Sequence, residues 1–92
     1  MGGGESKIFN KLSIMLDEYE DMLEMKKKYV EQRDTVSLQT LDKDMDVLTK
    51  KIRDELSAVN KIVKKEDDVE SFQFVNRRFQ YYLNKNNAIT FT

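Results

Sequence analysis

The chain has 92 residues, of which 16 are basic and 17 acidic, so its net charge is −1. A chain of this length forms one small domain that buries only roughly 60 to 65% of its unfolded surface, and the lack of a basic excess argues against nucleic-acid binding. Cysteine and histidine are absent, which removes disulfides, thiolates, and the commonest general base and metal ligand. With no membrane-length apolar run or secretory signal, the sequence predicts a cytoplasmic protein that is not an enzyme and has no cofactor, no metal and no stable membrane insertion.

The first six residues contain all three glycines and are expected to form a flexible segment ahead of a single helical domain over residues 7–92. They also fit the myristoylation pattern, because Gly2 follows the initiator Met and Ser6 lies at the required distance. Two interpretations therefore stay open, a lipid anchor at Gly2 or a plain glycine linker. A single acyl chain would anchor the protein only weakly.

Apolar residues that recur every seven positions predict a first amphipathic helix over residues 7–31. The acidic residues of this segment lie outside the apolar stripe and indicate a solvated surface. Lys26, Lys27 and Lys28, near the end of the helix, have the charge that the helix dipole favours there. The stripe consists of Ile8, Phe9, Leu12, Met15, Leu16, Tyr19, Met22, Leu23, Tyr29 and Val30.

A second apolar stripe with a different phase predicts a helix over residues 37–65. The phase break between Glu31 and Ser37, with Asp34 inside it, predicts a turn. The two helices would then form an antiparallel hairpin. The alternative is one continuous helix over residues 7–64 that dimerises as a coiled coil. The second stripe consists of Leu38, Leu41, Met45, Leu48, Ile52, Leu56, Val59 and Val63.

Three aspartates of the second helix, Asp42, Asp44 and Asp46, imitate the opening of a calcium-binding loop. Such a loop needs a glycine where this chain has Val47 and a bidentate glutamate where it has Arg53. We therefore interpret the aspartates as the outer face of a helix and not as a metal site.

Two lysines followed by the three acids Glu66, Asp67 and Asp68 predict a second junction, because these signs suit the adjoining helix ends. Asp67 and Glu70 are spaced like a variant of the capping box. A third helix over residues 68–85 would pack on the hairpin and complete a small three-helix bundle. The apolar ending AITFT is expected to belong to a longer element.

The third helix contains the most informative segment, Ser71 to Lys85, which holds five of the nine aromatic residues and no acid. Helical spacing places Phe72, Val75, Phe79 and Tyr82 on one face, which is expected to close the core of the hairpin. The remaining aromatic and basic residues are a candidate partner-binding surface, since Tyr, Phe and Arg are enriched in interface cores. A fourth helix or the second chain of a homodimer is the alternative cover for this face. Its residues are Phe74, Arg77, Arg78 and Tyr81.

Three segments carry a resemblance to a known family: LSIMLDEYEDMLEMKKKYVEQ, TLDKDMDVLTKKIRDEL and, late in the chain, LNKNNAI. This pattern resembles the FlgN-type flagellar export chaperones, whose third helix has a similar segment with Leu83, Asn84 and Asn87 at its characteristic positions. The resemblance implies a helical bundle that binds the amphipathic C-terminal helix of a secreted flagellar component. It adds Leu83 and Asn87 to the predicted partner-binding residues.

Two further resemblances supply alternative functions. The segment DTVSLQTLD is similar to the Ser-Gln-Glu-Leu-Asp signature of small hairpin phosphatases that act on response regulators, with matches at Gln39, Leu41 and Asp42. The segment LDKDMDVLTKKIR is similar to the Lys-x-Asp-Leu motif of lysosome-positioning adaptor subunits. These imply an aspartyl-phosphate phosphatase that depends on Asp42, or a coiled-coil adaptor subunit with a lipid-anchored N-terminus.

The sequence therefore predicts an all-α protein, an antiparallel hairpin with a third helix, that works as a protein–protein interaction module. It would bind the amphipathic helix of a partner in a groove between helices, and self-association into a homodimer is the second kind of partner. The predicted partner-binding residues are Phe74, Arg77, Arg78, Tyr81, Leu83 and Asn87.

Overall fold

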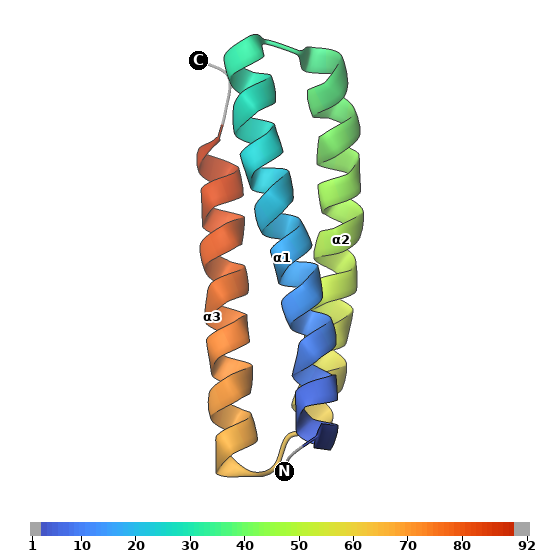
Figure 1. The fold of residues 1–92 in the computed structure, drawn as a ribbon, viewed down its shortest axis with the longest axis vertical. Helices are drawn as coiled ribbons and strands as arrows, with labels where there is room; N and C mark the ends of the chain where they lie inside the picture. Colours follow the sequence, from blue (N-terminus) through green and yellow to red (C-terminus); the bar gives the residue numbers. More distant parts are fainter. Residues whose placement is uncertain (1–2, 90–92) are drawn as a thin grey trace.

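Three α-helices make up the part of the chain that the structure describes, which is the backbone of residues 3–89 and the side chains of residues 9–89. In the computed structural model these helices are α1 (Gly3–Gln32), α2 (Thr35–Ile62) and α3 (Glu66–Ala88). They lie side by side in an elongated bundle of 47 × 21 × 18 Å, and in the view of Figure 1 α1 lies between α2 and α3. The predicted all-α fold and three-helix bundle are confirmed.

The predicted boundaries of α1 and α2 are displaced by a few residues. Helix α1 begins at Gly3 instead of residue 7. Glycine weakens a helix, but it adopts helical angles without strain, so the glycines do not prevent the helix from starting there. Helix α2 ends at Ile62 instead of residue 65, since the backbone becomes extended at Val63, where φ is −76° and ψ is 122°. The lipid attachment considered for Gly2 lies outside the described residues.

The predicted turn between α1 and α2 is present, and it excludes the continuous helix over residues 7–64 because the chain reverses there. Arg33 adopts a left-handed conformation with φ of 56°. The amide of Asp34 donates to the carbonyl of Tyr29 at 2.9 Å, and the amide of Arg33 donates to that of Val30 at 3.2 Å. This pair of bonds is the Schellman motif, formed here without the glycine that would have marked it in the sequence.

Asp34 then caps the N-terminus of α2. Its carboxylate accepts hydrogen bonds from the amide of Ser37 at 3.1 Å and from the Ser37 hydroxyl at 2.7 Å. Such bonds satisfy donors that the first helical turn leaves without a partner. The hydroxyl and amide of Ser37 also hold the pKa of Asp34 below its ordinary value.

The junction between α2 and α3 differs from the predicted one. Lys65 occupies the N-cap position of α3, so Asp67 is the second residue of the helix and the capping box of Asp67 with Glu70 does not form. The three acids from Glu66 to Asp68 do lie in the first turn, where the helix dipole favours negative charge. At the other end α3 continues through Asn84, Asn86 and Asn87 to Ala88 instead of stopping at residue 85.

The core contains most residues of the two predicted stripes together with the inner face of α3. Of the predicted residues, Val30 is only half-buried and the side chain of Ile8 lies outside the described residues. Tyr19 of α1 is fully buried and lies next to two aromatic rings of α3. Its ring meets Phe79 edge to face, with centroids 6.4 Å apart, and stacks on Tyr82 at 6.3 Å. The prediction that α3 closes the hairpin through this face is confirmed. The buried apolar residues of α3 are Val75, Phe79 and Tyr82, with Phe72, Leu83 and Ile89 partly buried beside them.

Among the helices that the structure describes, none has a segment both long enough and apolar enough to cross a membrane.

Candidate functional site

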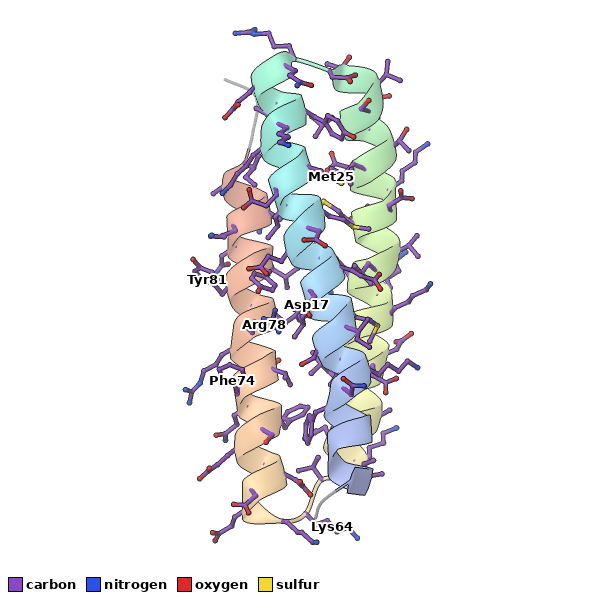
Figure 2. The ribbon with its side chains drawn as sticks, viewed as in Figure 1. Asp17, Met25, Lys64, Phe74, Arg78 and Tyr81 are labelled. Carbon is purple, nitrogen blue, oxygen red and sulfur yellow. The ribbon has the colours of Figure 1, made fainter. Side chains whose placement is uncertain are left out.

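The outer side of α3 exposes two large aromatic residues. Phe74 is 67% exposed and Tyr81 is 56% exposed, and they are two helical turns apart. Figure 2 shows both side chains on the side of α3 that faces away from α1. Arg77 is also exposed, and the ammonium of Lys85 lies 5.0 Å from the centre of the Tyr81 ring. We call Phe74, Arg77, Tyr81 and Lys85 the outer aromatic face.

Arg78 was predicted to belong to this partner-binding face, but its guanidinium forms hydrogen bonds with other residues of the chain. Its Nη2 donates to Oδ1 of Asp17 at 2.6 Å and its Nε donates to the hydroxyl of Tyr82 at 2.8 Å. Figure 2 places Arg78 and Asp17 where α3 meets α1. Partial burial lowers the pKa of Arg78, but its bonds to Asp17 and Tyr82 outweigh this effect and the net pKa is raised. Arg78 therefore joins α3 to α1.

Leu83 and Asn87, which the family resemblance supplied, lie on another side of α3. Both line a cavity of about 430 Å³ that also involves Tyr19 of α1 and several residues of α2, among them Thr49 and Arg53. Leu83 is partly buried against the core, whereas Asn87 is exposed. The six predicted residues therefore do not form one surface: Phe74, Arg77 and Tyr81 share the outer aromatic face, and the others lie elsewhere.

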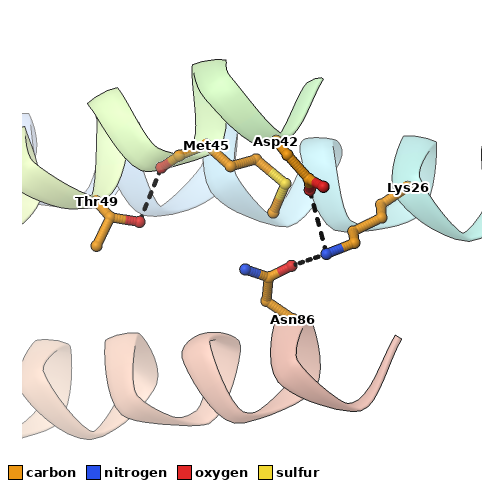
Figure 3. A network of polar contacts seen from close by, with 5 residues as sticks. All are labelled: Lys26, Asp42, Met45, Thr49 and Asn86. Atoms are coloured by element: carbon orange, nitrogen blue, oxygen red, sulfur yellow. Dashed lines mark hydrogen bonds and ion pairs between the residues drawn. The ribbon is translucent and has the colours of Figure 1, made fainter. Parts of the chain in front are cut away.

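A buried lysine connects all three helices. Lys26 of α1 is only 9% exposed, and its Nζ donates to Oδ1 of Asn86 at 2.6 Å and forms an ion pair with Oδ1 of Asp42 at 3.2 Å. Figure 3 shows these groups from α1, α2 and α3 converging. In the sequence Lys26 was assigned only to the end of the first helix, and this role was not predicted. Its position seven residues after buried Tyr19 was the available signal, because that spacing keeps it on the core side.

Next to this lysine, the hydroxyl of Tyr19 is buried and makes no hydrogen bond within the described part of the chain. The hydroxyl of Thr49 donates instead to the carbonyl of Met45 at 2.8 Å (Figure 3). Burial raises the pKa of Tyr19, and the nearby side chains of Thr49 and Asn86 offset only part of this effect. A phenol in this position is held in its neutral form.

The alternative functions rested on residues of α2. Asp42, Asp44 and Asp46 lie inside the continuous helix, and no cluster of three potential metal-binding side chains occurs between residues 9 and 89. Asp42, the residue on which the phosphatase alternative depends, forms the ion pair with Lys26. Its carboxylate therefore has a structural partner.

No protein-family model matches the chain, and no curated protein or solved structure matches it at a significant level. The resemblance to FlgN-type chaperones thus stays a prediction. Function has to be inferred from the surfaces described above.

Proposed function

We propose that the protein is a non-enzymatic interaction module whose outer aromatic face binds the amphipathic helix of a partner protein in the cytoplasm. The observation that carries this proposal is the exposure of Phe74 and Tyr81, 67% and 56% respectively, on one side of α3. The opposite side of the same helix already supplies the core with Phe79 and Tyr82. The exposed rings therefore have no part in closing the bundle.

The composition of the face suits binding better than simple solvation. Aromatic rings bring a large apolar area with few rotatable bonds, which is why Tyr, Phe and Arg are enriched where interfaces are buried. Phe74 and Tyr81 are two turns apart, so they can contact apolar residues that recur along a second helix. A surface helix that served only solubility would carry polar residues at these positions.

The charges beside the rings define the chemistry of the partner. Arg77 is exposed, and Lys85 lies against the ring of Tyr81. Both would favour acidic side chains next to the apolar stripe of the bound helix. The amphipathic helix of an exported flagellar protein, as the sequence resemblance implies, is one partner of this type.

Binding can be measured with two synthetic helical peptides of about 20 residues, a length that supports helix formation. Both peptides carry the same leucine stripe, one flanked by glutamates and the other by lysines. Fluorescence anisotropy should show that the acidic peptide binds and that Phe74→Ala or Tyr81→Ala weakens it about tenfold or more, as expected for a central interface residue. Val69→Ala is the matched control, because Val69 is a 37% exposed apolar residue on a different side of α3.

Equal binding of the two peptides, or unchanged affinity in folded Phe74→Ala and Tyr81→Ala variants, would overturn the proposal. Circular dichroism of each variant separates loss of binding from loss of structure.

A further inference from the structure

The hairpin of α1 and α2 has a second side, which α3 does not cover. Two hollows lie there, one of about 240 Å³ lined in part by Met25, Tyr29 and Asp44, and one of about 410 Å³ lined in part by Lys11 and Lys51. No residue of α3 lines either of them. Met25 follows Lys11 by fourteen residues, and this interval returns nearly to the same side of a helix. The two hollows therefore lie on the same side of the hairpin of α1 and α2, and we call this side the uncovered seam.

Exposed apolar residues follow this seam. Met25 and Val36 line the first hollow and are 43% and 75% exposed. Ile14 lies eleven residues before Met25 and Val47 lies eleven residues after Val36, an interval of three turns that keeps each pair on one side of its helix. Ile62 follows Lys51 by the same interval. Five of the eight exposed large apolar residues in the described chain thus belong to this side and only three to α3. Figure 2 shows Met25 between α1 and α2.

Two opposite charges of α2 flank Val47. Asp44 precedes it by three residues and Lys51 follows it by four, and all three side chains are exposed. If two copies of α2 meet in antiparallel orientation at Val47, Asp44 of each copy lies near Lys51 of the other. A parallel pairing of the same helices would bring like charges together. These two charges of α2 are thus complementary in the antiparallel orientation, whereas the exposed acids Glu18 and Asp21, which lie on the same side of α1 as Met25 and Ile14, add no attraction.

Helix α1 contributes apolar residues to the same pairing. The ion pairs of Lys11 with Glu55, at 3.4 Å, and of Lys26 with Asp42 fix how α1 lies beside α2, and they place Val47 about level with residues 19 and 20. Ile14 and Met25 lie at similar distances on either side of that level. In an antiparallel pair of chains, Met25 of one copy therefore meets Ile14 of the other.

We propose that two copies of this chain associate through the uncovered seam, antiparallel, with Val47 next to the two-fold axis. The contact is isologous, so each apolar residue and each charge of the seam is used twice. It leaves the outer aromatic face of α3 free on both copies. The dimer and the partner-binding face are independent of each other.

Charge reversal tests the proposed pairing. Light scattering and sedimentation equilibrium should show a dimer for the natural sequence. Asp44→Lys should raise the dissociation constant of the dimer tenfold or more, and the double variant Asp44→Lys with Lys51→Asp should recover the dimer. Glu20→Lys is the matched control, because Glu20 is an exposed acid of α1 that lines neither hollow. A chain that is monomeric throughout the micromolar range, or a double variant that fails to recover while remaining folded, would overturn the proposal.

Disulfide trapping tests the orientation, and the chain is suited to it because it contains no cysteine. Val47→Cys should crosslink two copies on mild oxidation, since the two sulfurs would meet near the axis. Val36→Cys should not, because eleven residues on each copy separate these positions by about 33 Å, far beyond the roughly 7 Å limit between Cα atoms for a disulfide. Crosslinking of Val36→Cys at the same rate as Val47→Cys would contradict the antiparallel arrangement.

Discussion

The interior contact of α3 with α1 and the outer aromatic face of α3 use the same residue types for different purposes. Phe79 is 1% exposed and packs edge to face on Tyr19, whereas Phe74, five residues earlier in the same helix, is 67% exposed. Tyr82 is buried in the stack with Tyr19, and Tyr81, next to it in sequence, is 56% exposed. Helical phase, not residue type, therefore decides which aromatic residues hold the fold together.

The polar residues show the same contrast. Asn86 accepts a hydrogen bond from the buried ammonium of Lys26 at 2.6 Å, while Asn87 beside it is exposed. Inside the bundle a polar group either forms a hydrogen bond with a protein group or lowers stability by losing its water. On the outer face it forms hydrogen bonds with water. Matched substitutions at paired positions measure this difference directly.

The largest difference is expected between the two phenylalanines. Phe79→Ala should lower the free energy of unfolding by about 3 to 5 kcal/mol, because it leaves a cavity against Tyr19 and loses the buried ring. Phe74→Ala should change it by less than about 0.5 kcal/mol, as is usual at exposed positions. Urea denaturation followed by circular dichroism measures both values.

A small domain has roughly 5 to 15 kcal/mol of stability in total, so Phe79→Ala removes a large share of it, and Phe79→Leu serves as a milder variant. Equal losses in the Phe79 and Phe74 variants would mean that both faces of α3 are packed, and the comparison would fail.

A smaller difference is expected between the two asparagines. Asn86→Ala removes the amide oxygen that accepts a hydrogen bond from Lys26. Of the two contacts of the buried ammonium drawn in Figure 3, only the ion pair with Asp42 is then left. The loss should be about 1 to 3 kcal/mol, the usual cost of a buried polar group that loses its hydrogen bond. Asn87→Ala should be nearly neutral. A neutral Asn86→Ala variant would show that Lys26 finds another acceptor or reaches solvent.

Much of this architecture could be predicted from sequence because it depends on periodicity. The two apolar stripes, the turn near Asp34 and the two faces of α3 all follow from the spacing of apolar residues. Spacing could indicate that Lys26 lies on the core side of α1, but it could not predict the partners of Lys26 and Arg78, because these lie about sixty positions away, at Asn86 and Asp17 respectively. From the sequence alone a charged residue is expected to be solvated, and only the packing of the helices shows which distant residue buries it.

The uncovered seam illustrates a second limit. Its exposed residues, among them Met25, Val36 and Val47, lie at the edges of the stripes that predicted α1 and α2. Periodicity shows that a helix has an apolar side but not how wide a part of that side the neighbouring helices cover. The structure was needed to show that α3 covers one side of the hairpin and leaves the other open.

The smallest difference, and one of opposite sign, is expected between the two tyrosines. Tyr19→Phe removes a buried hydroxyl that makes no hydrogen bond within the described residues, so stability should stay unchanged or rise by up to about 1 kcal/mol. Tyr81→Phe alters an exposed ring and should have no measurable effect. A loss of more than about 1 kcal/mol in Tyr19→Phe would show that the hydroxyl has a partner, with Thr49 and Asn86 the nearest groups.

Alkaline pH should enlarge the difference in stability between the natural sequence and Tyr19→Phe. Because burial raises the pKa of Tyr19 above its ordinary 10.0, the unfolded chain releases this proton at a lower pH than the folded one. The contribution of Tyr19 to stability is therefore fully present below about pH 10 and declines as the pH rises through the raised pKa of the folded state. The natural sequence should lose stability in this range more steeply than Tyr19→Phe. Urea denaturation at a series of pH values from neutral into this range measures the slopes, and parallel slopes for the two proteins would mean that Tyr19 ionises as freely in the folded bundle as in the unfolded chain.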